Sequence, residues 1–415
     1  MPGCKVTFMS VKPLDGIKVL DLTWVYAGPF ATQILGDLGA EIIKIEAAPV
    51  GDKTRIMPPF KNGYSGYFAT LNRGKKSLAL NLKREKGREL FLELARKCDV
   101  LTENFAPGAL AQLGLGYEEV KKANPRIIYA SASGFGSYGP YARRPCIDPV
   151  GQAMGGLMSL TGYTDRSPLK TGPGVADAIM GLYLVSGVLS ALRLRDLTGE
   201  GQRIEVAMMD SIFTVLEENV IKTSMEGEAP PRRGNLDPFG VPWDTFLTKD
   251  GRWVMVCAFS SPIFEELYGM MGRDDLVEKY KGDNIDAFLK RSANQEELNA
   301  VFAGWVRENM TADDLESLFI AMDAPMGIIK DVKELLDDPH LKARDMVVDV
   351  DHPRLGKVKT FNLPIKFFGT TVGVKPGEVP LDPEVGQHSH ELLKTYLGKS
   401  DEEIKSLRQD NVIWT

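Results

Sequence analysis

Residues 17–46 read IKVLDLTWVYAGPFATQILGDLGAEIIKIE, and this stretch decides the fold class. Its first part, Ile17–Leu22, is the short apolar run typical of a buried strand. A turn over Thr23–Pro29 follows, and we predict a helix from there to about Leu38. The next strand is predicted at Glu41–Glu46. A strand, a helix and a second strand in this order indicate a parallel sheet covered by helices.

The same alternation continues through the first half of the chain. Strands are predicted at Ser77–Leu82, Asp99–Thr102 and Arg126–Ser131, and helices near Glu85–Lys97 and Gly108–Gln112. Ligands of such sheets bind at the carboxyl ends of the strands. No Gly-x-Gly-x-x-Gly follows the first strand and no phosphate-binding P-loop occurs. The sequence therefore predicts a Rossmann-like sheet without the dinucleotide-binding fingerprint.

The second half has a different pattern. After about Thr223 comes Met225–Pro242, which is rich in turn residues and reads as a linker or loop. A hairpin and several helices are expected beyond it, which indicates a smaller α+β unit. The expected elements are strands at Thr245–Leu247 and Arg252–Ala258, helices to about Met322, strands at Val347–Val350 and Val358–Phe361, and a last helix around Glu391–Leu397.

Composition excludes several classes of protein. The 415 residues are 43% hydrophobic and 26% charged, as in ordinary globular proteins. The net charge of −6 argues against nucleic-acid binding. The sequence contains no apolar run long enough to span a membrane, so we do not expect a membrane protein. The start, Met1–Phe8, lacks the apolar core of a signal peptide. The four cysteines are widely spaced with no histidine near them, so we predict no disulfide framework, no metal site and a cytoplasmic location; they are Cys4, Cys98, Cys146 and Cys257.

One carboxylate stands out in residues 171–181, TGPGVADAIMG. Asp177 lies among small and apolar residues and opens a helix predicted to run through Leu192. A carboxylate in apolar surroundings is costly unless something uses it. Small neighbours let a bulky group approach it, and the N–H groups of a helix start can hold developing negative charge. These features suit a nucleophilic carboxylate, but the residues alone leave open an aspartate that caps its own helix.

Seven short segments give a more specific signal through their order and spacing. They are Pro13–Leu22, Ala27–Pro29, Asp37–Glu46, Gly51–Arg55, Asn72–Ser77, Glu103–Gly108 and Thr198–Gln202. Over essentially its whole length the chain resembles the class III CoA-transferases, a family that includes formyl-CoA:oxalate and carnitine CoA-transferases. Asp177 falls on the catalytic aspartate of that family. The resemblance implies a transferase that moves CoA from an acyl-CoA to a carboxylic acid through a mixed anhydride and an aspartyl-CoA thioester.

The resemblance also implies where CoA binds. The family's CoA-contacting positions correspond to Val25, Tyr26, Ala27, Leu80, Asn81, Leu82, Lys83, Asn104, Phe105, Ala106, Arg144, Pro145, Cys146 and Ile147. Lys83 and Arg144 are the natural phosphate partners, although a solvated surface position is an equal alternative for a single lysine. CoA would be a substrate, with no permanently bound cofactor and no metal. Departures from the formyl-CoA enzyme at Ala47 and Gln112 leave the acyl donor and the acceptor acid open.

Two alternatives remain beside the transferase. The α-methylacyl-CoA racemases share the fold and use a histidine, but Ile147 occupies that position and cannot transfer a proton. The other alternative is a catalytically silent partner subunit, against which Asp177 and its small neighbours argue. Asp148, next to Ile147, either orients the site or caps a helix.

The family architecture implies an interlocked homodimer. We expect a large CoA-binding Rossmann-like domain over residues 1–224, a small α+β domain over 225–335, and a C-terminal return to the large domain over 336–415. Its partners would be acyl-CoA, a carboxylic acid and a second copy of the chain.

Overall fold

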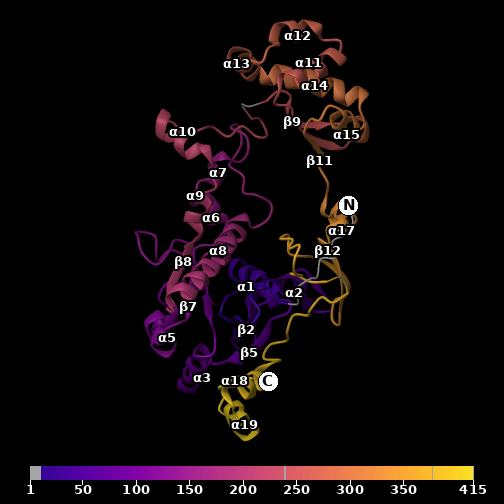
Figure 1. Cartoon of the computed structure of the whole chain (residues 1–415). Helices are drawn as coiled ribbons and strands as arrows, with labels where there is room; N and C mark the ends of the chain where they lie inside the picture. The colour runs from indigo at the N-terminus through magenta and orange to yellow at the C-terminus, as the bar shows by residue number, and fades with distance from the viewer. Residues whose placement is uncertain (1–10, 238–239, 376, 415) are drawn as a thin grey trace. The chain divides into compact units, whose positions relative to one another are not determined.

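The computed structural model describes residues 11–237, 240–375 and 377–414 (Figure 1). Cys4 and the segment in which we expect no signal peptide lie outside these ranges. The chain divides into two compact units. Unit 1 takes in the described parts of residues 1–157, 170–228 and 338–415, and unit 2 takes in those of 158–169 and 229–337. Each unit is considered by itself below.

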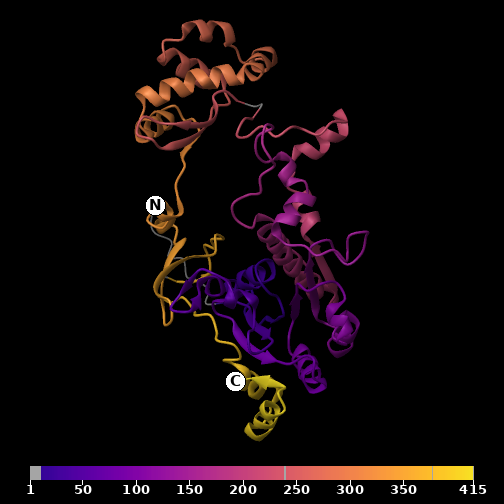
Figure 2. The same cartoon turned by 180° about the vertical axis from the view of Figure 1, so that it is seen from behind.

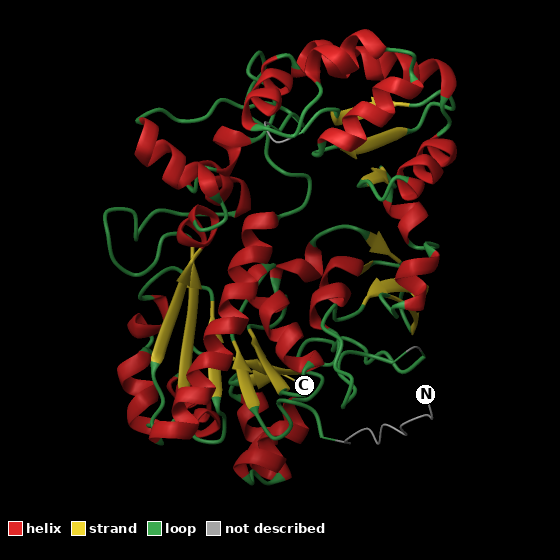
Figure 3. Cartoon of the chain, turned by 45° about the horizontal axis from the view of Figure 1, so that its top comes forward, coloured by secondary structure: helices red, strands yellow, loops and turns green. Residues whose placement is uncertain are grey.

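A seven-stranded sheet forms the centre of unit 1 (Figure 3). Its order is β14-β5-β2-β1-β6-β7-β8, and every neighbouring pair is parallel except β14 with β5. The strands are β1 (Lys18–Asp21), β2 (Glu41–Glu46), β5 (Lys76–Leu80), β6 (Val100–Glu103), β7 (Ile128–Ser133), β8 (Arg203–Ala207) and β14 (Ile413–Trp414). The predicted α/β class with a mostly parallel sheet is therefore confirmed.

Helices cover both faces of this sheet because neighbouring strand residues point to opposite sides. Val19 of β1 belongs to a core formed with α1 (Ala27–Asp37) and α8 (Val175–Thr198). Leu20, the next residue, belongs to a second core formed with α3 (Glu85–Ala95), α5 (Tyr117–Ala123), α18 (Ser389–Leu397) and α19 (Asp401–Gln409). The same alternation holds at Ile42 and Ile43 of β2. The apolar pairs Val19–Leu20 and Ile42–Ile43 thus bury one side chain on each face of the sheet.

Shorter elements connect the strands and complete the chain as far as residue 226. They are η1 (Lys53–Ile56), β3 (Phe60–Lys61), β4 (Tyr64–Ser65), α2 (Gly66–Asn72), α4 (Ala109–Gln112), α6 (Asp148–Met154), α7 (Leu157–Leu160), α9 (Met208–Phe213) and α10 (Glu218–Glu226). In the later part of unit 1, α17 (Pro339–Ala343) precedes the antiparallel pair β12 (Val347–His352) and β13 (Gly356–Phe361).

Unit 2 has its own small sheet and its own core. Three antiparallel strands lie in the order β11-β10-β9, and the predicted hairpin is β9 with β10. The core packs aromatic rings such as Phe264 and Tyr268, which stack with centroids 4.3 Å apart. The elements are β9 (Trp243–Leu247), β10 (Trp253–Cys257), α11 (Ser261–Met270), α12 (Asp274–Tyr280), α13 (Ile285–Ala293), α14 (Gln295–Asn309), α15 (Ala312–Ala321), β11 (Met326–Ile328) and α16 (Val332–Leu335).

The C-terminal prediction was incomplete. The helix expected around Glu391–Leu397 is α18, but α19 and β14 follow it. Ser400 and Glu403 form a capping box at the start of α19, so a sequence signal for this helix was present and was missed. Figure 2 shows α18 and α19 together in yellow, and α18 contacts α3.

By length and composition alone, α8 is the single described helix that could cross a membrane. It contacts α1, α9, β7 and β8, and Ala176, Leu184 and Val188 of α8 are fully buried in the first core. We therefore interpret α8 as a core helix of unit 1.

Candidate active site at the carboxyl edge of the sheet

Three loops of unit 1 meet at one edge of the sheet. Because β1, β5 and β6 run parallel, the loops that follow them leave from the same edge. The turn Trp24–Ala27 follows β1, Asn81–Lys83 follows β5, and Asn104–Ala106 follows β6. The structure thus brings together most of the positions at which the resemblance implies CoA contacts.

The side chains in these loops differ in what they can offer a ligand. Leu80 is buried in the second core, and Ala27 is buried in the first. Asn81 is tied back to the C-terminal segment, since its amide Nδ2 donates to the carbonyl of Asn411 at 3.2 Å. Lys83 and Ala106 are exposed. Among these residues, Lys83 therefore carries the exposed charge.

Asn104 has a role that its sequence position did not reveal. Its Oδ1 accepts the backbone N–H of Trp24 at 2.8 Å, and its Nδ2 donates to the backbone carbonyl of Trp24 at 2.7 Å. The Trp24 ring packs edge-on against Phe105, with centroids 5.7 Å apart. The loops after β1 and β6 are therefore joined through Asn104 and Phe105.

The segment Arg144–Ile147 leads into α6. Arg144 is exposed and lies over the ring of Tyr141, 4.2 Å from its centroid. Pro145 and Ile147 are also exposed. Cys146 Sγ lies 3.9 Å from Met208 Sδ, and burial, followed by Asp177 and Asp148, raises the pKa of this thiol to about 11. Cys146 is thus a protonated thiol near the two aspartates.

Asp177 does not cap its own helix, so the capping alternative was wrong. α8 begins at Val175, and its N-cap is Gly174, which has no side chain with which to cap the helix. Asp148 takes that role instead, because its Oδ1 accepts the N–H groups of Ala176 at 2.8 Å and of Asp177 at 3.3 Å. A glutamine of α6, Gln152, donates to the other oxygen of Asp148 at 2.7 Å. Asp148 is therefore both a helix cap and a neighbour of Asp177.

The electrostatic surroundings make Asp177 unusual. Burial, and then the charge of Asp148, raise its pKa from 3.8 to about 7. Asp148 itself accepts hydrogen bonds from backbone and amide N–H groups. A carboxylate with a pKa near neutrality binds a proton or attacks an electrophile more readily than an ordinary aspartate. This is a property that a nucleophile or a base needs.

Two tyrosines lie near Asp177. Burial, then Asp177 and Asp148, raise the pKa of Tyr26, while burial, followed by Asp177, raises that of Tyr67 to about 12. Their ring centroids are 6.4 Å apart. A Cβ atom at Gly174 would lie 3.3 Å from the Tyr26 ring, so this ring packs on the backbone just before α8. Tyr67 was not predicted, because nothing around it in the sequence of α2 marks it as a site residue.

Tyr67 also lines a cavity of unit 1. A cavity of about 360 Å³ within unit 1 is lined by α2, β12 and β13, including Tyr67, Arg73 and His352. Its remaining walls are largely apolar. In residues 11–237, 240–375 and 377–414, no group of three or more His, Cys, Asp or Glu side chains could hold a metal ion.

Similarities to known proteins extend over the whole site. The model of the family described as CoA-transferase family III matches residues 14–389. The succinyl-CoA:mesaconate CoA-transferase of Haloarcula marismortui is 39% identical over 392 residues, 92% of this chain and 95% of that protein. The acetyl-CoA:oxalate CoA-transferase of Acetobacter aceti is 39% identical over 386 residues, 92% of this chain and 96% of that protein. A crystal structure of a CAIB/BAIF family protein from Brucella suis matches with a TM-score of 0.81 at 35% identity, covering 93% of this chain and 99% of that one.

Proposed function

Because this chain belongs to CoA-transferase family III and is a CoA-transferase that uses CoA as co-substrate, we propose that Asp177 carries CoA between two acids. The observation that supports this role is the raised pKa of Asp177 in the first turn of α8. An ionised carboxylate there is poorly stabilised by its surroundings and so has a strong tendency to form a bond.

The proposed reaction has four steps, each of which exchanges one bond for another. An Asp177 oxygen attacks the acyl-CoA carbonyl, the C–S bond breaks, and a mixed anhydride and the CoA thiolate form. The thiolate attacks the Asp177 carbonyl carbon, which releases the donor acid and leaves an aspartyl-CoA thioester. The acceptor carboxylate attacks this thioester, and the thiolate leaves again. It then attacks the acceptor carbonyl, which frees Asp177 and the new acyl-CoA.

Neighbouring groups can support these steps. Each step passes through an oxyanion, which hydrogen-bond donors in a partly buried site stabilise. The raised pKa values of Tyr26 and Tyr67 keep both hydroxyl groups protonated, so they can donate. We propose that CoA binds along the loops after β1, β5 and β6, with Lys83 and Arg144 near its phosphates.

We further propose that the acceptor is a dicarboxylic acid. The names of the two relatives pair succinyl-CoA with mesaconate and acetyl-CoA with oxalate. Both of these acceptors are dicarboxylates, whereas the two donors differ. The donor is therefore best found by testing several CoA esters.

A second copy of the chain is also proposed. Although α8 packs into the core, one row of its apolar side chains is exposed, namely Leu182, Tyr183, Leu189, Leu194 and Leu197. An exposed apolar stripe of this kind is typical of a protein interface. Light scattering on the purified protein should give twice the chain mass, and a monomer would contradict the homodimer.

The test of the carrier role is chemical trapping. The protein is mixed with succinyl-, acetyl- or formyl-CoA, hydroxylamine is added, and peptides are analysed by mass spectrometry. We expect a donor-dependent hydroxamate on Asp177 and none in Asp177→Ala. Asp196→Ala is the matched control, because Asp196 is an exposed aspartate of the same helix, and it should trap like the wild type. Absence of any adduct, with CoA binding measurable, would rule out covalent transfer from these donors.

A further inference from the structure

The turn after β1 contains a strained residue. Val25 has a φ angle of 70°, in the left-handed region that β-branched residues seldom adopt. Such a conformation persists only where the surrounding structure fixes it. The contacts around Val25 therefore show what holds the turn in place.

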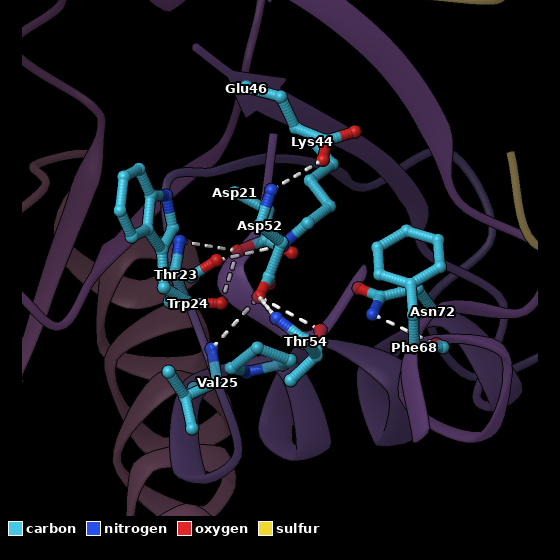
Figure 4. Close-up of polar contacts among 12 residues, drawn as sticks. Asp21, Thr23, Trp24, Val25, Lys44, Glu46, Asp52, Thr54, Phe68 and Asn72 are labelled. Atoms are coloured by element: carbon cyan, nitrogen blue, oxygen red, sulfur yellow. Dashed lines mark hydrogen bonds and ion pairs between the residues drawn. The ribbon is translucent and has the colours of Figure 1, made fainter. Parts of the chain in front are cut away.

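Two side chains from other loops hold the backbone of the turn just before the strained residue. Asn104 binds both backbone groups of Trp24, at 2.8 and 2.7 Å. Asp52 accepts the N–H of Val25 at 3.2 Å and that of Thr54 at 2.9 Å (Figure 4). The two peptide groups that precede the strained residue, one on each side of Trp24, are thus fixed by side chains distant in sequence.

A buried charge network supports Asp52 from behind (Figure 4). Lys44 is fully buried, and its Nζ lies 2.9 Å from an oxygen of Asp52 and donates to the carbonyl of Thr23 at 2.7 Å. The N–H of Thr23 donates to Asp21 at 2.9 Å. Burial would lower the pKa of Lys44, but Asp21 and Asp52 outweigh it and raise this pKa. The lysine therefore stays charged and holds both Asp52 and the turn.

The conformation of this turn also determines where Tyr26 lies. Tyr26 directly follows Val25, and its ring packs against Gly174 at the start of α8, close enough for Asp177 to raise its pKa. If Val25 relaxed to a negative φ, the chain direction after Trp24 would change, and the Tyr26 ring would leave this position.

We propose that Asn104 and Asp52 are positioning residues that hold Val25 in its left-handed conformation and so fix Tyr26 and the CoA-binding turn beside Asp177. The proposal deepens the proposed function and rests on it for the role of Asp177. It also changes the interpretation of Asn104, which acts on CoA through the turn.

A double-mutant cycle tests the proposal. Asn104→Ala, Val25→Gly and the double variant are compared by the dissociation constant for CoA and by kcat and KM for the donor. Asn104→Ala should weaken CoA binding about tenfold, which is the usual size of the interaction between two residues in direct contact. Glycine adopts positive φ without steric cost, so in the Val25→Gly background the same change should weaken binding only about twofold.

Asn124→Ala serves as the control variant. The side chain of Asn124 also binds the backbone of a distant segment, because its Nδ2 donates to the carbonyls of Ala95 and Cys98, both at 2.9 Å. Asn124→Ala should lower the melting temperature without changing CoA affinity in either background. An equal effect of Asn104→Ala in both backgrounds, as loss of a direct CoA contact would give, overturns the proposal.

A second variant, Asn104→Asp, is available if the first one does not fold. If Asn104→Ala does not fold, Asn104→Asp takes its place in the cycle, because it keeps the acceptor for the Trp24 N–H and loses the donor. CoA affinity decides this proposal even where hydroxylamine trapping fails on the wild type. In that case covalent transfer from the tested donors is ruled out, while a coupled cycle still supports the positioning role.

Discussion

The ionised form of Asp177 should make the folded protein less stable, and Asp177→Asn should remove this cost. Its pKa is raised from 3.8 to about 7, first by burial and then by Asp148. Between about pH 4 and pH 7 the folded chain holds a proton that the unfolded chain has lost, so stability falls as pH rises through this window. A shift of this size corresponds to about 4 kcal/mol above pH 7.

The expected gain for Asp177→Asn follows from the same values. Asparagine has nearly the same shape as a protonated aspartate and cannot ionise. The variant should be more stable than the wild type by about 2 kcal/mol at pH 5 and about 4 kcal/mol at pH 8. For a chain of this size, the larger value corresponds to a rise in melting temperature of about 4–7 °C.

Thermal melting of the ligand-free protein at pH 5, 6, 7 and 8 measures this difference. The variant should lose transferase activity and gain stability at the same time. Asp196→Asn, at an exposed aspartate of the same helix, should show no gain that grows with pH. The reasoning is refuted if Asp177→Asn is destabilised at pH 8, or if its gain is the same at pH 5 and pH 8.

Three further predictions concern the surroundings of the site and unit 2. Asp148→Asn should lower the pKa of Asp177, so the midpoint of the kcat/KM profile should move below pH 7, and an unchanged midpoint would contradict the role of Asp148. Lys44→Met removes a fully buried cation between aspartates and should cost about 3–5 kcal/mol in urea unfolding, whereas a loss under 1 kcal/mol would contradict this. Phe264→Ala empties the centre of the unit 2 core and should cost about 3–5 kcal/mol, seen as faster hydrogen exchange in α11 and α14 and unchanged exchange in β1.

Regular patterns made much of the fold predictable. The apolar pairs Val19–Leu20 and Ile42–Ile43 put one residue on each face of the sheet, and such continuous runs are what a buried parallel strand requires. The hairpin of β9 and β10 was marked by its turn residues. β14 was not predictable, because two residues carry too little pattern and their pairing with β5 is a long-range contact.

The site was predictable only in part, for a similar reason. Asp177 could be singled out because its small and apolar neighbours are adjacent in sequence. The cap of its helix, Asp148, lies 29 positions earlier, and Asn104 lies 80 positions from its partner Trp24. Tyr67 reaches Asp177 from a helix more distant still. Such contacts depend on how elements pack, and local sequence does not record them.

The position of β14 has a consequence for synthesis on the ribosome. This strand closes the edge of the sheet beside β5. At the same edge the N–H of Ala79 donates to Oγ of Ser389, which lies 310 positions later at the start of α18. Until those residues emerge, a nascent chain carries β5 with an open edge, the kind of surface that pairs with other chains. Most of unit 2 is one continuous segment, residues 229–337, so this unit can fold before the edge of β5 is covered. Chaperone contact during translation is therefore expected to concentrate on residues 76–80 and to end once residues 389–414 have left the exit tunnel.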